Sequence, residues 1–146
     1  MAKGDDIQER LVLLGVSLIH ICDKLPETKA AGHIASQLLQ SGTSPASNYA
    51  EARRAESDCD FVHKLKVVLK ELNECLVWLA LIERGNLLPV DCLKKPQEDC
   101  TVVCRIIAAS IRTVKGRMTE GAGEKTEMTR HSIFHLQSSC IRHDPA

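Results

Sequence analysis

Long rows of apolar residues recur along this chain at alternating spacings of four and three. One row consists of Ile7, Leu11, Leu14, Leu18, Ile21 and Leu25, and another of Phe61, Leu65, Val68, Leu72, Cys75, Leu79 and Ile82. This spacing places apolar side chains along one face of a helix that packs lengthwise on other helices. No segment alternates apolar and polar residues as a half-buried strand does, so the sequence predicts an all-α fold.

Prolines and glycines mark the ends of the expected helices. Pro26 ends the first helix, because its ring cannot continue the hydrogen-bond ladder. Gly85 is expected to end the third helix in the left-handed cap conformation. A connector over Leu87–Pro96 then leads to a fourth helix over Gln97–Met118. Four helices with short connections predict an antiparallel up-and-down four-helix bundle.

A chain of 146 residues is long enough for one domain. We assign residues 1–118 to the bundle and residues 119–146 to a flexible C-terminal tail. Gly121, Gly123 and mixed polar residues favour this boundary. The tail could include a short helix around Arg130–Gln137.

The stretch from Ser41 to Ala52 reads SGTSPASNYAEA, a composition more typical of a turn than of a helix. The second helix must nevertheless run from about Glu27 to Arg54 to cover the third, and apolar or small residues keep the helical spacing throughout. We therefore favour one continuous helix, kinked near Pro45. The alternative makes Ser44 an N-cap and Pro45 the first residue of a separate helix.

Polar side chains follow Pro45 where the helical spacing expects a core position. An unpaired buried amide costs about 1–3 kcal/mol, so Asn48 needs hydrogen-bond partners. Helical neighbours three and four residues apart can supply them. We predict a structural polar network that consists of Ser44, Ser47, Asn48 and Glu51, and we expect no catalytic role for it.

The segment Cys75–Ile82, CLVWLALI, is apolar on every face of two helical turns. A four-helix core cannot bury all of these side chains from one side, and exposed apolar patches mark protein interfaces. The first helix also has apolar residues outside its core row. We predict a homo-oligomer interface made of Val12, Val16, Ile19, Val77, Trp78 and Leu81. The alternative is that the tail or the connector over Leu87–Leu93 covers them.

The chain has 19 basic and 19 acidic residues, so no net field attracts nucleic acid or an anionic membrane. Local basic residues are the candidate nucleic-acid contacts: Arg53, Arg54, Arg105, Arg112, Lys115 and Arg117. A solvated outer face is the interpretation we favour for them, because aromatic stacking platforms are missing.

The sequence gives little support for a metal site or a catalytic site. His131, His135, Cys140 and His143 have the residue types of a zinc site, but no CxxC pair anchors them. Cys100 and Cys104 are four residues apart on an apolar helix, where cysteines usually serve as small core residues. No base is spaced to activate Ser44, and no phosphate-binding loop follows a strand. We expect no metal, no cofactor and no enzymatic activity.

Seven cysteines without a CxxC pair favour a reducing compartment. The N-terminus lacks a signal peptide's pattern, and the apolar stretch Leu11–Cys22 is shorter than the roughly 20 residues that span a bilayer. The expected location is the cytoplasm, without a membrane partner.

The run from Gln37 to Ile82 resembles the four-helix-bundle family encoded by intervening sequences of 23S rRNA genes. Gln-Leu, a serine-containing turn, an asparagine and Glu-Ala before a long amphipathic helix carry the resemblance, with Ser44, Asn48 and Glu51 at the motif positions. It covers about residues 7–116. It implies a small bundle that assembles into a ring of five.

A more distant fold relative is the accessory protein of diversity-generating retroelements, a basic pentamer that binds a reverse transcriptase and nucleic acid. Many relatives carry arginine before the serine turn, where this chain has Leu39 and Gln40. With the zero net charge, this difference favours a non-enzymatic oligomeric scaffold or adaptor. The alternative is a nucleic-acid-binding accessory protein, for example a partner of a reverse transcriptase.

Overall fold

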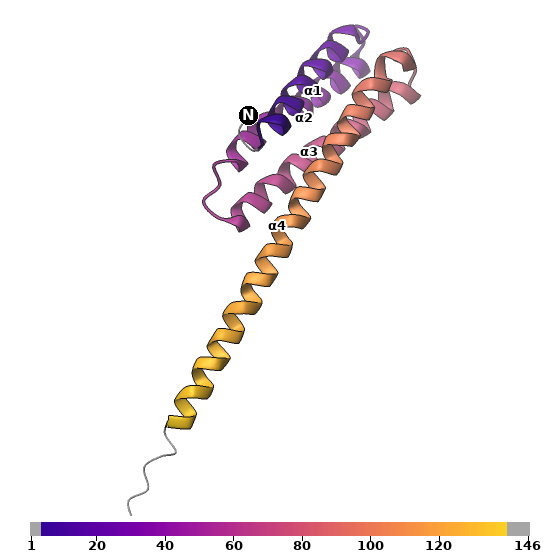
Figure 1. Ribbon diagram of the computed structural model, residues 1–146. Coiled ribbons are helices and arrows are strands. Elements are labelled where there is room, and N and C mark those ends of the chain that lie inside the picture. The colour runs from indigo at the N-terminus through magenta and orange to yellow at the C-terminus, as the bar shows by residue number, and fades with distance from the viewer. Residues whose placement is uncertain (1–3, 140–146) are drawn as a thin grey trace, which may run out of the picture. The chain divides into compact units, whose positions relative to one another are not determined.

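Four α-helices make up the part of the chain that the computed structural model describes, which is residues 4–139, with side chains for residues 4–122. They are α1 (Asp5–Lys24), α2 (Lys29–Ala52), α3 (Asp58–Arg84) and α4 (Val90–Ser139), and no strand occurs among the described residues (Figure 1). The prediction of an all-α, four-helix fold is confirmed.

Side-chain caps set the starts of two helices. Thr28 precedes α2, and its Oγ1 accepts a hydrogen bond of 3.2 Å from the backbone N–H of Ala31. Ser57 precedes α3, and its Oγ accepts a hydrogen bond of 3.1 Å from the N–H of Asp60. Each cap satisfies a backbone donor that has no partner within the first turn of its helix. The expected start of the second helix near Glu27 was therefore slightly early.

The end of α3 differs from the prediction in one residue. Gly85 has a φ of −78°, and Asn86 takes the left-handed conformation with a φ of 53°. The backbone N–H of Leu87 then donates to the carbonyl of Ile82 at 3.0 Å. Asparagine is among the side chains that tolerate this conformation best, because its short amide can bond locally.

The fourth helix is longer at both ends than the sequence indicated. It begins at Val90 instead of Gln97 and includes Pro96, which is buried together with Leu93. Burial of these apolar residues offsets the hydrogen bond that proline removes. The helix also continues past Met118, through two glycines, to Ser139. Each glycine lowers helix stability by about 1 kcal/mol relative to alanine. Neighbouring residues with high helix propensity offset this loss.

The chain divides into two compact units, Met1–Ile111 and Arg112–Ala146. The first unit contains α1, α2, α3 and the first part of α4. The expected boundary at residue 118 between bundle and tail stays a prediction, since α4 contributes residues to both units.

Two side-chain hydrogen bonds within the first unit join α1 and α2 in opposite chain order. Near the start of α1, the Gln8 amide donates to the carbonyl of Ala46 at 2.8 Å; near its end, the Cys22 thiol donates to the carbonyl of Ala35 at 3.4 Å. Buried apolar residues at the predicted spacing fill the space between the helices. They include Leu11, Leu14, Leu18 and Ile21 of α1, Leu65, Val68, Leu72, Leu79 and Ile82 of α3, and Val103 and Ile107 of α4.

The unusual stretch after Ser41 lies inside α2, which continues through Pro45. A separate helix beginning at Pro45 was therefore the wrong alternative. Hydroxyl groups in this stretch bond back to their own helix: Ser41 Oγ donates to the carbonyl of Gln37 at 2.9 Å, and Thr43 Oγ1 donates to that of Leu39 at 2.7 Å. This local bonding satisfies the hydroxyls without leaving the helical conformation. The kink angle stays a prediction.

Candidate interaction surfaces

The outer side of α1 exposes a row of large aliphatic side chains. We call Val12, Leu13, Val16 and Ile19 the α1 surface; Leu13 is 59% exposed and the other three are 37–42% exposed. These positions alternate with the buried core row of the same helix. Leaving four such side chains in water costs free energy that contact with a second apolar surface would recover.

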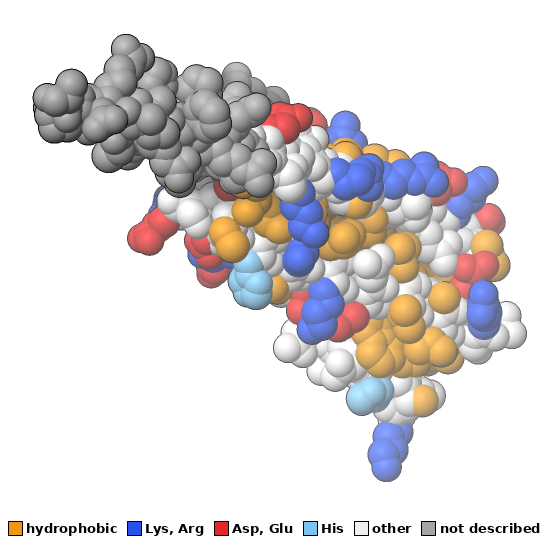
Figure 2. Space-filling view, turned by 90° about the horizontal axis from the view of Figure 1, so that it is seen from below, with side chains coloured by type: hydrophobic (Ala, Val, Ile, Leu, Met, Phe, Trp, Pro, Cys, Tyr) orange, Lys and Arg blue, Asp and Glu red, His pale blue; other side chains and the backbone are white. Residues whose placement is uncertain are grey.

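The outer side of α3 carries a second apolar area. We call Val77 and Leu81 the α3 surface, and they are 57% and 46% exposed. Trp78 is less exposed than these two residues. It is half-buried, and its ring meets that of His33 in α2 edge-on, with the ring centroids 6.0 Å apart. Trp78 was predicted to lie in the homo-oligomer interface, which stays a prediction; the ring contact with His33 shows that α2 lies against one edge of its ring. Figure 2 shows exposed hydrophobic side chains gathered between basic and acidic ones.

A shallow, open groove of about 480 Å³ adjoins the α3 surface. Its lining residues all come from α3 and are Lys66, Leu69, Lys70, Asn73, Glu74 and Val77. Lys70 Nζ lies 3.4 Å from Glu74 Oε1, so the charges at this edge partly compensate each other. The groove extends the apolar area along α3 without enclosing a small-molecule site.

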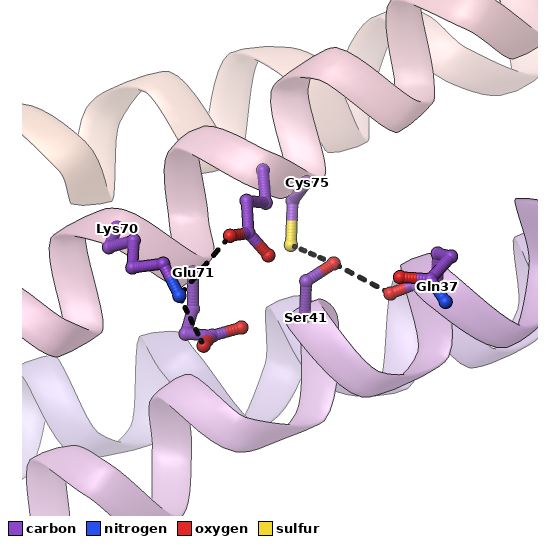
Figure 3. A network of polar contacts seen from close by, with 6 residues as sticks. Gln37, Ser41, Lys70, Glu71 and Cys75 are labelled. Carbon is purple, nitrogen blue, oxygen red and sulfur yellow. Dashed lines mark hydrogen bonds and ion pairs between the residues drawn. The ribbon is translucent and has the colours of Figure 1, made fainter.

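Ser41 is a buried polar residue of the core, with 2% of its surface exposed. Besides its bond to Gln37, its Oγ accepts a hydrogen bond from the Cys75 thiol of α3 at 3.5 Å (Figure 3). The contact links α2 to α3 through two small side chains. Sequence reasoning placed Ser41 in the core row but did not identify its partner, because only the packing of two helices brings Ser41 and Cys75 together.

The predicted polar stretch lies on α2 with mixed exposure. Ser47 is exposed and its Oγ donates to the carbonyl of Ser44 at 3.0 Å, whereas the Ser44 Oγ is buried without a hydrogen-bond partner among the described residues. Asn48 is half-buried and Glu51 is exposed. Hydrogen bonds do not join these four side chains into one network. At a half-exposed position water can solvate the Asn48 amide, so it does not need the buried partners that we expected.

The basic residues are exposed, but they are not equivalent. Arg53 at the end of α2 forms an ion pair of 2.6 Å with Asp5 at the start of α1, which ties the two helix ends together. Arg54 and Arg105 are exposed in the first unit. Arg112, Lys115 and Arg117 are exposed on α4 in the second unit, and none of these three pairs with an acidic residue in the described part of the chain.

The remaining candidate ligands lie outside the side chains that the structure describes. The histidines at 131 and 135 fall in the part of α4 given by its backbone, and Cys140 and His143 lie beyond it. Among the described residues, no group of three or more histidine, cysteine or acidic side chains is placed to hold a metal ion. No described helix has the length and apolar character needed to cross a membrane.

Comparisons with known proteins identify a family and a similar solved structure. Residues 6–109 match the family described as 23S rRNA-intervening sequence protein. A solved crystal structure, of a protein of unknown function from the S23 ribosomal protein family of Bacteroides thetaiotaomicron, is similar to this chain, with a TM-score of 0.68 and 28% sequence identity. The likeness covers 72% of this chain and 97% of that one. No curated protein matches.

Proposed function

The chain belongs to the 23S rRNA-intervening sequence protein family, and on that premise we propose that it is a non-enzymatic, homo-oligomeric scaffold or adaptor. The observation that carries the proposal is the pair of exposed apolar areas on α1 and α3. Two different surfaces on one subunit suit a head-to-tail contact, in which the α1 surface of one copy packs against the α3 surface of the next. Such contacts close into a ring when the rotation between neighbours permits it.

The expected number of subunits is five, from the family resemblance. The zero net charge of the chain supports self-association, because it produces little repulsion between copies. The groove beside Val77 widens the area that a neighbouring α1 helix would contact.

The oligomer is tested by light scattering coupled to size exclusion. We expect the wild-type protein to be larger than a monomer, and Val16→Glu and Val77→Glu to reduce its mass, since each places a charge in an apolar interface. Val90→Glu is the matched control, because Val90 is 56% exposed but lies outside both surfaces. A monomeric wild-type protein, or unchanged mass in both interface variants, would show the proposal to be wrong.

A nucleic-acid-binding accessory protein, such as a partner of a reverse transcriptase, is the second candidate. Arg112, Lys115 and Arg117 favour it, because they are exposed and form no ion pair with an acidic residue that the structure describes. Phosphate contacts release counterions, so binding through these residues would weaken steeply with salt.

Anisotropy with labelled structured RNA and duplex DNA, at low and near-physiological salt, separates the two candidates. A scaffold should show no salt-sensitive binding. Binding that weakens steeply with salt and is lost in Arg105→Ala/Arg112→Ala, but is kept in Lys94→Ala, would place the nucleic-acid-binding function first. Lys94 is a suitable control because it is exposed near the start of the same helix.

A further inference from the structure

Ion pairs flank the apolar areas of α1 and α3, and the two pairs have opposite orders along the chain. On α1, Arg10 Nε lies 3.2 Å from Asp6 Oδ2, so an acid precedes a base. On α3, Lys70 Nζ lies 3.4 Å from Glu74 Oε1, so a base precedes an acid. The order on α3 is the less favourable one within a helix, because it opposes the helix dipole. The stability of α3 alone therefore gives no reason for this order.

Each ion pair is followed by exposed aliphatic side chains at the same distance along its helix. Leu13 comes three residues after the α1 pair, and Val77 comes three residues after the α3 pair. About one turn later, Val16 follows on α1 and Leu81 follows on α3. Because every α-helix rises about 1.5 Å per residue, the two patterns have nearly equal lengths. Two such helices, laid side by side in the same direction, bring opposite charges together at one end and apolar side chains together at the other.

The side chains of both ion pairs are accessible to a second molecule. On α1, 69% of the Asp6 side chain and 48% of the Arg10 side chain are exposed. On α3, the exposed fractions are 68% for Lys70 and 44% for Glu74. Glu71 also lies near Lys70, with 3.9 Å between Oε1 and Nζ (Figure 3), but only 18% of its side chain is exposed. Glu71 therefore contributes less charge to the outer face than the pair does.

We propose that α1 of one copy packs in parallel on α3 of the next copy, so that the two ion pairs and the two apolar surfaces match. This inference rests on the homo-oligomer proposed above, and it gives the direction and register of the contact. The matched positions are Asp6 with Lys70, Arg10 with Glu74, Leu13 with Val77, and Val16 with Leu81.

The same charges disfavour other ways of pairing these helices. Two α1 helices in parallel register place like charges together at Asp6 and at Arg10. Two α3 helices do the same at Lys70 and at Glu74. Antiparallel packing of α1 on α3, with the ion pairs side by side, places acid against acid and base against base. Repulsion of this kind selects among packing arrangements, which leaves the parallel contact between two different surfaces as the favoured one.

Charge reversal followed by charge exchange tests the register in the full-length protein. Lys70→Glu places an acid against Asp6, so we expect the concentration at which half of the subunits are assembled to rise by about tenfold. The double variant Asp6→Lys/Lys70→Glu restores opposite charges and should bring this concentration back to within about threefold of the wild-type value. Sedimentation velocity over a dilution series measures all three proteins.

A control and a second exchange accompany this test. Lys94→Glu should leave assembly unchanged, because Lys94 is exposed and lies outside both surfaces. The second exchange uses the other matched charges: Glu74→Lys should weaken assembly, and Arg10→Glu in the same chain should restore it. Far-ultraviolet circular dichroism checks that each variant is folded, which we expect because the changed side chains are exposed.

The outcomes separate this register from the oligomer itself. A monomeric wild-type protein would show that the proposed function is wrong. An oligomeric wild-type protein whose assembly is unaffected by Lys70→Glu would overturn the register and leave the oligomer standing. Double variants that assemble no better than the single ones would also overturn the register, because the exchanged charges would then not meet across the contact.

Discussion

Gly42 of α2 and Leu18 of α1 pack so closely that a Cβ atom added at Gly42 would lie 2.7 Å from Leu18 Cδ1. A Cβ atom at Gly15 would likewise lie 3.2 Å from the carbonyl oxygen of Gly42. The two glycines thus mark a point where α1 and α2 pack closely against each other. Leu18 is fully buried there, so it has little room to move.

Gly42→Ala should therefore lower the free energy of unfolding by about 1–3 kcal/mol, because overpacking forces a buried side chain or the backbone to shift. Gly32→Ala is the matched control on the same helix, where an added Cβ meets nothing within 4 Å. It should raise the free energy of unfolding by about 0.5–1 kcal/mol. Urea denaturation measures both, and equal effects would contradict the close approach at Gly42.

Ser57→Ala should destabilise the protein by about 1 kcal/mol, since it removes the side-chain oxygen that accepts from the N–H of Asp60. Ser57→Asp keeps an acceptor at the cap and should restore most of the loss. Thermal unfolding followed by circular dichroism compares the three proteins. A Ser57→Asp variant as unstable as Ser57→Ala would mean that the cap contributes little.

Stability should fall at alkaline pH because of Tyr49. Burial raises the pKa of this phenol above its usual value, with the nearby Arg53 acting in the opposite direction. A raised folded pKa contributes stability below the unfolded value of about 10, and this contribution is lost as the pH rises through the folded value. Urea midpoints at increasing pH should fall more in the wild-type protein than in Tyr49→Phe. Because the chain has one tyrosine, ultraviolet difference absorbance reports its ionisation directly.

The emission of the single tryptophan should depend on His33. The imidazole covers part of the Trp78 ring, so His33→Ala should shift the emission to longer wavelength and increase quenching by acrylamide. His63→Ala, an exposed histidine on α3, is the control and should change neither signal. Identical spectra for all three proteins would indicate that the ring contact is not populated in solution.

The core positions of α1 and α3 could be read directly from the sequence, because a helix repeats every 3.6 residues and water penalises any apolar face that is left uncovered. Leu11, Leu14, Leu18 and the row from Leu65 to Ile82 are buried as that spacing predicts. The continuity of α2 through Pro45 followed from the same period.

Helix ends were less predictable. Pro96 and Gly121 normally interrupt helices, but α4 includes both. Local signals of this kind amount to about 1–3 kcal/mol, and the burial of Leu93 and Pro96 is of comparable size. At Pro96 the balance between the two is decided by packing, which the local sequence does not contain, whereas Gly121 is exposed and meets no neighbour within 4 Å.

The sequence by itself determined that this chain forms helices, which faces of α1 and α3 are apolar, and which residues are available for surfaces outside the core. Only the tertiary structure decided which side chains meet. It placed His33 on Trp78, left Ser44 and Asn48 without the network expected for them, and brought Cys75 beside Ser41. The physical reason is that periodicity assigns a residue to a face of its own helix, whereas contacts between helices depend on their relative rotation and distance, which the whole core sets together.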